Sequence, residues 1–171
     1  MNILIIRHAP AGNSEQWLSQ GKKDSLRPLT PEGREKMQKT AAGLKSQLDG
    51  IDLIVSSPYV RCRQTVEILA LAFPEAKKIE WAALRPGGGF KDIPAKLAAL
   101  NDVASVALVG HEPTLSLLGS HLLSGRQGAF IRLRKGGCAL LEAPVPVRPG
   151  RAVLQWLLQS KQLRKLGKKA D

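Results

Sequence analysis

Four residues of this chain, Arg7, His8, Arg61 and His111, have the side-chain chemistry that phosphoryl transfer requires. Such a transfer needs a nucleophile in line with the leaving group and fixed positive charge around the other phosphoryl oxygens. A neutral imidazole is a competent nucleophile, and the arginine beside His8 disfavours the charged form of that ring. Arg7 and Arg61 offer planar forks of donors that match a phosphate and stay charged. His111, once protonated, would donate to a phosphate oxygen.

These residues follow three apolar segments that have the pattern of buried parallel strands. The segments are residues 2–7, 51–56 and 103–109, and helical patterns lie between them. In open α/β sheets, ligands bind in the crevice beyond the carboxyl ends of the strands. We therefore expect the two histidines and two arginines to converge at one edge of a sheet.

Helix-start signals stand between these strands. Thr30 and Pro31 predict a helix that runs to about Leu48, and Ser57-Pro58 predicts a second one that runs to about Ala72. Shorter helices are expected at about 93–100 and 113–123.

The C-terminal third of the chain is predicted to be mainly strand. Phe130–Leu133 and Cys138–Glu142 flank Lys135-Gly136-Gly137, a pattern that suggests a hairpin. Ala152–Leu158 is expected to be a further strand. Alternating strands and helices followed by a hairpin predict an α/β sandwich with a mostly parallel central sheet and an antiparallel edge.

Four segments of the chain resemble motifs of the histidine phosphatase (phosphoglycerate mutase-like) superfamily. They occur in the family's order and span about residues 2–125. They are the Arg-His segment Leu4–His8, the R-P-L-T-x-x-G stretch Arg27–Gly33, the S-P-x-x-R-x-x-Q-T segment Ser56–Thr65 and the second-histidine segment Val109–Pro113. The short chain and its Leu84–Gly87 stretch resemble the SixA-type phosphohistidine phosphatases in particular.

The resemblance implies a phosphoglycerate mutase-like three-layer sandwich and a phosphatase that works without metal or cofactor. In this reading His8 is the phosphorylated nucleophile, and the substrate is a histidine-phosphorylated signalling or transport protein. The residues that would complete the phosphate pocket are Arg7, Arg61, His111 and, as an extra contact, Arg27. Arg27 has a plainer alternative, because it would also suit an ion pair with Asp24.

One departure from the family pattern bears on the substrate. Larger members supply a Glu or Asp general acid from the segment that corresponds to Ala82–Gly89, which contains no carboxylate here. An alkyl alcohol needs a proton donor to leave well, whereas a protonated imidazole leaves readily. The sequence therefore favours a P–N substrate such as phosphohistidine. The alternative enzyme is a phosphatase for small phosphomonoesters, with Asp92 or Glu112 as the acid.

The net charge of +12 is concentrated in the last quarter of the chain. Residues 1–123 have a net charge of +3 and residues 124–171 one of +9, with five basic residues in Lys161–Lys169. We expect residues 1–160 to form a single histidine phosphatase domain and residues 161–171 a solvated basic tail. A non-enzymatic alternative is a module that binds nucleic acid or polyphosphate through this tail.

The remaining composition limits the class of protein. With 43% hydrophobic and 23% charged residues, the chain is in the ordinary globular range. It shows neither a signal-peptide pattern nor an apolar run that could span a bilayer, so we expect a cytoplasmic protein. We also expect a monomer. Neither Cys62 nor Cys138 begins the C-x5-R loop of cysteine-dependent phosphatases, and both are expected to be buried, inert thiols.

Overall fold

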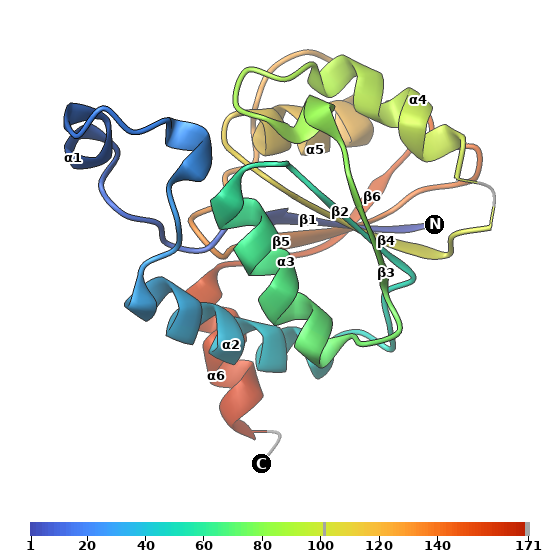
Figure 1. Ribbon diagram of the computed structural model, residues 1–171. Coiled ribbons are helices and arrows are strands. Elements are labelled where there is room, and N and C mark those ends of the chain that lie inside the picture. The colour runs from blue at the N-terminus through green and yellow to red at the C-terminus, as the bar shows by residue number, and fades with distance from the viewer. Residues whose placement is uncertain (101, 170–171) are drawn as a thin grey trace.

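A six-stranded sheet runs through the middle of the protein in the computed structural model, which describes residues 1–100 and 102–169 (Figure 1). The strand order is β3-β2-β4-β1-β5-β6. The first four strands in this order are parallel, β5 is antiparallel to β1, and β6 is antiparallel to β5. The strands are β1 (Asn2–Arg7), β2 (Leu53–Ser56), β3 (Lys77–Glu80), β4 (Ser105–Gly110), β5 (Cys138–Glu142) and β6 (Val153–Leu158). The predicted mostly parallel sheet is confirmed.

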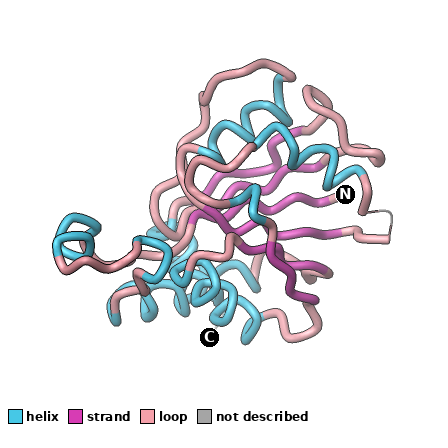
Figure 2. The backbone as a smooth tube through the Cα atoms, turned by 45° about the horizontal axis from the view of Figure 1, so that its top comes forward, coloured by secondary structure: helices cyan, strands magenta, loops and turns pink. Residues whose placement is uncertain are grey.

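Helices cover both faces of this sheet and complete the predicted three-layer sandwich (Figures 1 and 2). The second, third and sixth helices lie on one face, the fourth and fifth lie on the other, and the first stands apart. The helices are α1 (Ser14–Ser19), α2 (Pro31–Lys45), α3 (Val60–Ala72), α4 (Ile93–Ala98), α5 (Thr114–Ser124) and α6 (Ser160–Leu166). Short 3-10 turns are η1 (Asp24–Leu26), η2 (Ala82–Leu84), η3 (Phe90–Asp92) and η4 (Gly167–Lys169). Within the described residues, no helix has the length and apolar character to cross a membrane.

The central strand β1 is buried on both faces. Leu4 and Ile6 pack into the core beneath α2 and α3, whereas Ile3 and Ile5 pack into the core beneath α4 and α5. Each of these four side chains is at most 1% exposed. Because side chains alternate between the faces of a strand, an unbroken apolar run is what a strand between two helical layers requires.

The start of α2 touches the loop that follows β1. The side chain of Thr30 accepts a hydrogen bond from the backbone N–H of Gly33, and a proline takes the first helical position, as predicted. A Cβ on Gly33 would lie 2.0 Å from the carbonyl oxygen of Pro10, so the glycine permits this close approach. The helix ends at Lys45, about one turn before the predicted residue 48.

The start of α3 differs from the prediction. The helix begins at Val60, whereas the sequence indicated a start at the Ser57-Pro58 pair. The backbone N–H of Ser57 donates to the carbonyl oxygen of Val109 (2.9 Å) and so continues the contact between β2 and β4 beyond the end of β2. The chain then turns, and Arg61 lies in the first helical turn, as expected.

The predicted hairpin between residues 130–133 and 138–142 is wrong. The described residues 130–134 form no strand, and β5 pairs with β1 and β6 instead. The side chain of Gln159 bonds to the backbone here, because its amide donates to Arg132 O (2.9 Å) and accepts from Arg134 N (2.9 Å). These two bonds hold the segment against Gln159, the residue that follows β6. The last predicted strand is present as β6.

The basic C-terminal segment is in part a packed helix, which corrects the expectation of a solvated tail. α6 lies against α2, with Leu163 fully buried and the hydroxyl oxygens of Ser160 and Thr40 2.9 Å apart. A Cβ on Gly43 would lie 1.9 Å from the carbonyl oxygen of Leu163, so the two helix backbones are in direct contact. The end of the predicted tail, residues 170–171, lies outside the described residues.

We expect Gly43→Ala to lower the free energy of unfolding by about 1–3 kcal/mol. The added methyl group would overlap the backbone of α6, which would have to move and expose part of the core. Urea denaturation followed by circular dichroism measures the change. Gly50→Ala is the control, because a Cβ there meets no described atom within 4 Å beyond its chain neighbours. Equal stability of the two variants would contradict direct contact between α2 and α6.

Candidate active site

The structure brings the five predicted site residues together around one cavity of about 600 Å³. Arg7 and His8 come from the end of β1, and His111 comes from the end of β4. Arg61 lies in the first turn of α3, and Arg27 lies between η1 and α2. The cavity is at the carboxyl edge of the parallel strands, where an open α/β sheet binds its ligands.

His8 is held in one orientation by its neighbours. Its backbone N–H donates to the carbonyl oxygen of Gly110 (3.1 Å), and the residue is only 6% exposed. Ring Nδ1 lies 2.7 Å from the carbonyl oxygen of Ala9, which can only accept, so Nδ1 carries the proton and Nε2 keeps its lone pair. Burial, with the nearby charges of Arg61 and Arg7, lowers the pKa of His8 to about 3. The ring is therefore neutral at neutral pH and has a free nucleophilic nitrogen.

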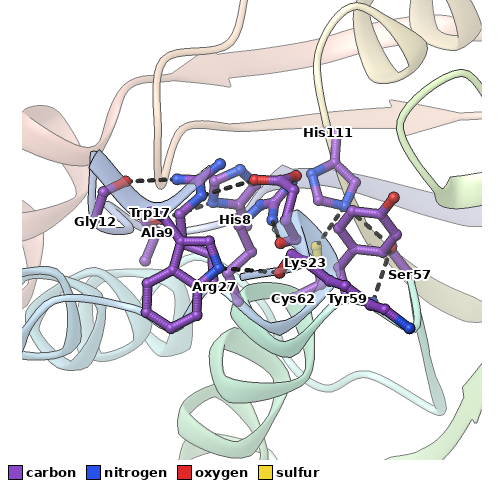
Figure 3. A network of polar contacts seen from close by, with 12 residues as sticks. His8, Ala9, Gly12, Trp17, Lys23, Arg27, Ser57, Tyr59, Cys62 and His111 are labelled. Carbon is purple, nitrogen blue, oxygen red and sulfur yellow. Dashed lines mark hydrogen bonds and ion pairs between the residues drawn. The ribbon is translucent and has the colours of Figure 1, made fainter. Parts of the chain in front are cut away.

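His111 lies beside His8, with their ring centroids 5.0 Å apart. Its Nε2 is 3.0 Å from the hydroxyl of Ser57 and 3.3 Å from the thiol sulfur of Cys62 (Figure 3). The ring of Tyr59 packs edge-on against it at a centroid distance of 5.2 Å. Burial and then the charge of Arg61 lower the pKa of His111 to about 3. A bound anion would oppose this shift, because negative charge favours the protonated ring.

The arginines present their guanidinium groups to the same cavity. Arg7 donates from Nη1 to the carbonyl oxygen of Leu133 (2.9 Å), and Arg27 donates from Nη1 to that of Gly12 (2.6 Å). The Nε atoms of Arg7 and Arg61 are buried and have no hydrogen-bond partner among the described residues. Buried donors without partners are rare, and a bound oxyanion would relieve the concentration of positive charge around them.

Asp24 holds two of these arginines. Its carboxylate accepts from Arg27 Nε (2.8 Å) and from Arg61 Nη2 (3.0 Å), and its backbone carbonyl accepts from Arg61 Nη1 (2.8 Å). Partial burial raises the pKa of Asp24, but the bond from Arg27 and the charge of Arg61 outweigh it and keep that pKa below its ordinary value. Arg27 therefore forms the ion pair with Asp24 that its plainer alternative predicted, and it also lines the cavity. Its contact with a phosphate stays a prediction.

Comparison with known proteins agrees with this geometry. Residues 3–86 match the model of the histidine phosphatase superfamily (branch 1). The phosphohistidine phosphatase SixA of Escherichia coli (strain K12) is 32% identical over 129 residues, which cover 73% of this chain and 76% of that protein. The chain belongs to the histidine phosphatase superfamily. The SixA homolog of Haemophilus influenzae (strain ATCC 51907 / DSM 11121 / KW20 / Rd) is 31% identical over 136 residues, covering 74% and 79% of the two chains.

Solved structures of this superfamily share the fold. The structure of the protein histidine phosphatase SixA complexed with tungstate superposes with a TM-score of 0.81 at 26% identity. The match covers 95% of this chain and 99% of that one. The predicted family is therefore confirmed, and the predicted fold is confirmed over nearly the whole length of the chain.

Two carboxylates, those of Asp24 and Glu112, are among the described residues that line the cavity. The segment Ala82–Gly89, which contains no carboxylate, contributes Pro86 to the cavity. Of the two alternative acids predicted, Glu112 lines the cavity, whereas Asp92 is not among its described lining residues. The Oε1 atom of Glu112 is buried and has no hydrogen-bond partner among the described residues. The structure thus places Glu112, but not Asp92, where it could meet a substrate.

Lys135 is a cavity residue that the sequence reasoning missed. The incorrect hairpin placed it in a surface turn. The backbone N–H of the next residue, Gly136, instead bonds to the carbonyl oxygens of Arg7 (3.0 Å) and His8 (3.1 Å), which ties this turn to the end of β1. Burial and then the charges of the nearby arginines lower the pKa of Lys135. Its position next to Gly136 was the available signal, because Gly136 has a φ of 73°, a turn conformation that favours glycine.

Both cysteines are buried free thiols in the described structure, as predicted. Burial raises the pKa of Cys62 to about 12 and raises that of Cys138 as well. Neither is therefore a thiolate at neutral pH, although Cys62 touches His111. The described residues contain no group of three or more His, Cys, Asp or Glu side chains that could hold a metal ion.

We expect the free energy of unfolding to fall as the pH is lowered from 7 to 5. The pKa values of His8 and His111 are lowered to about 3 in the folded protein, whereas histidines in an unfolded chain have a pKa of about 6.5. Below pH 6.5 the unfolded state binds protons that the folded state excludes, and stability is lost. Denaturant titrations at the two pH values measure the loss. The free energy of unfolding of His111→Gln should depend clearly less on pH. An unchanged pH dependence would contradict the lowered pKa of His111.

Proposed function

We propose that this protein hydrolyses phosphohistidine on a protein substrate through a covalent phosphoryl intermediate on His8. The observation that carries the proposal is the neutral, buried ring of His8, whose free Nε2 lies in a cavity lined by three arginines. Membership of the superfamily supports it, as do the names of the relatives, a phosphohistidine phosphatase and its homolog. The similar SixA structure holds tungstate, a tetrahedral oxyanion like phosphate.

Two displacements at phosphorus account for the reaction. First, the Nε2 lone pair of His8 attacks phosphorus, and the P–N bond of the substrate breaks with its electron pair going to the substrate's imidazole. That imidazole keeps the proton on its other nitrogen and leaves neutral. Water then attacks the phosphoryl group, gives its proton to the departing phosphate, and returns His8 with its lone pair. The Nδ1–H bond to Ala9 keeps the ring aligned in both steps.

The surrounding cations would stabilise the phosphoryl group while it transfers. Arg7, Arg27 and Arg61 supply fixed positive charge to its oxygens. A bound phosphoryl group would compete with Asp24 for the forks of Arg27 and Arg61. It would also favour the protonated form of His111, which would then donate to an oxygen.

The state of Asp24 supports a leaving group that needs no acid from this carboxylate. Asp24 pairs with two arginines and has a lowered pKa, so it stays ionised at neutral pH and has no proton to give. A leaving imidazole with a protonated second nitrogen needs no such help, whereas an alkoxide does. These features support phosphohistidine over alkyl phosphates.

We expect His8→Ala to lower turnover of a histidine-phosphorylated protein by at least about a thousandfold, because the nucleophile is lost. Rapid quenching at alkaline pH with a ³²P-labelled substrate measures both product release and the phosphoenzyme. The wild-type protein should carry an acid-labile label that His8→Ala lacks. His121→Ala is the control, since His121 lies on α5 outside the cavity lining. Equal turnover or equal labelling in wild type and His8→Ala would refute the proposed nucleophile.

A second candidate function is hydrolysis of small phosphomonoesters. One observation favours it: Glu112 lines the cavity and has an oxygen without a hydrogen-bond partner among the described residues. If protonated, this side chain would serve as the acid that an alkyl leaving group requires.

Glu112→Gln separates the two candidates. For a phosphohistidine phosphatase we expect the variant to turn over free phosphohistidine within about threefold of wild type, because no proton donor is needed. Turnover of phosphoserine, an alkyl phosphate, should be low in both proteins. Steady-state release of phosphate measures both reactions. Efficient wild-type turnover of phosphoserine that is lost in Glu112→Gln would favour the second candidate.

We also propose that the catalytic unit is a single domain that includes α6, because the core contact of Leu163 and the hydrogen bond of Ser160 join this helix to α2. Polyanion binding by the basic C-terminal segment stays a prediction. The same holds for the monomeric state and the cytoplasmic location.

A further inference from the structure

A small lobe projects from the domain beside the cavity. This lobe, residues 12–28, contains α1 and η1 and stands away from both helical layers in two views of the molecule (Figures 1 and 2). Its base is closed by an antiparallel bridge between Ala11 and Leu29 and by a hydrogen bond from Gly12 N to Pro28 O (3.3 Å). We call it the α1 lobe.

The α1 lobe is ordered by its own contacts. The indole Nε1 of Trp17 donates to the carbonyl oxygen of Lys23 (3.0 Å; Figure 3), and the ammonium of Lys22 lies 4.6 Å from the centroid of the Trp17 ring. The side chain of Asn13 caps α1 by accepting from Gln16 N (3.0 Å). Every residue of α1 is exposed or half-buried, so the lobe holds its shape without contributing to the core.

The α1 lobe exposes both apolar and positively charged side chains. Leu18 is 54% exposed and Leu26 is 55% exposed. Between these leucines in the sequence lie Lys22 and Lys23, which are both exposed. In α1 one carboxylate is exposed, that of Glu15. Exposed apolar side chains that gather in one patch with a polar rim mark sites of protein–protein interaction.

The same lobe forms one wall of the cavity. Asp24 and Arg27, at its inner side, line the cavity together with Gly12 and Asn13. A histidine side chain is short, so a phosphohistidine can reach His8 only if the protein that carries it lies against the rim of the cavity. The α1 lobe is part of that rim, and its leucines and lysines lie on the same short segment.

We propose that the α1 lobe is the docking surface for the histidine-phosphorylated protein, whose contact surface is acidic and has an apolar patch. Leu18 and Leu26 would pack on the patch, and Lys22 and Lys23 would attract the acidic groups around it. Lys135, at the cavity, and exposed Arg132 beyond it add positive charge from another segment. The inference rests on the proposed phosphohistidine activity and names the surface that selects the protein.

Docking outside the cavity should contribute to kcat/KM for a protein substrate and not to kcat/KM for a small substrate. Leu18, Lys22 and Lys23 are not among the described residues that line the cavity, so hydrolysis of free phosphohistidine reports on the catalytic groups. A phosphorylated protein needs both the cavity and the α1 lobe. The ratio of the two kcat/KM values therefore isolates the contribution of the lobe.

The test compares Leu18→Asp with Leu71→Asp on two probes. The probes are an acidic phosphotransfer protein phosphorylated on histidine and free phosphohistidine. We expect Leu18→Asp to lower kcat/KM for the protein at least tenfold, chiefly through KM, with free phosphohistidine unchanged. Leu71 is the matched control, because it is 80% exposed and lies on α3 about 15 Å along the helix from Arg61. Leu71→Asp should leave both values unchanged.

Charge is tested in the same way with Lys23→Glu and the control Lys77→Glu, which changes an exposed lysine of β3. Lys23→Glu should lower kcat/KM for the acidic protein at least fivefold at low salt. Added salt should reduce this difference in kcat/KM between the variant and the wild type. Equal kcat/KM for the protein substrate in Leu18→Asp, Lys23→Glu and wild type would overturn the proposed docking surface. Turnover of free phosphohistidine would then still support the proposed function. Loss of turnover of both probes in the wild type would instead refute the proposed function itself.

Discussion

The pairing of β1 with β4 is the contact on which the whole site depends. Its register sets Arg7 opposite Gly110, so the residues that follow, His8 and His111, leave the sheet side by side. Both strands are buried on both faces, and a shift by one residue would turn every side chain to the opposite layer. Core packing therefore fixes this register, and with it the 5.0 Å separation of the two imidazole rings.

Positive charge gathered at this edge gives the two imidazoles their chemistry. Burial and the charge of Arg61 both act against protonation, which leaves His8 and His111 neutral in a cavity lined by three arginines. Asp24 moderates the charge by bridging Arg27 and Arg61. The carboxylate of Asp24 thereby holds Arg27 and Arg61 in place at the cavity, and Nε2 of His8 keeps its lone pair.

Local patterns predicted most of the elements, and the failures have a shared cause. The buried strands and the start of α2 at Pro31 follow from apolar runs and a capping threonine, which act within a few residues. The hairpin was wrong because the side chain of Gln159, distant in the sequence, bonds to the backbone of residues 130–134. The basic tail was wrong in part because Gly43 lets α6 rest directly on α2. Both depend on contacts between remote segments.

The sequence by itself determined the superfamily, the α/β architecture and five residues of the cavity, because motif residues that follow parallel strands meet at one edge of the sheet. Only the tertiary structure decided how those residues are partnered. It placed Asp24 between two arginines, brought Lys135 and Glu112 to the cavity, and set the α1 lobe at its rim. Such contacts depend on the paths of loops, and loop paths follow from packing between segments that lie far apart in the chain.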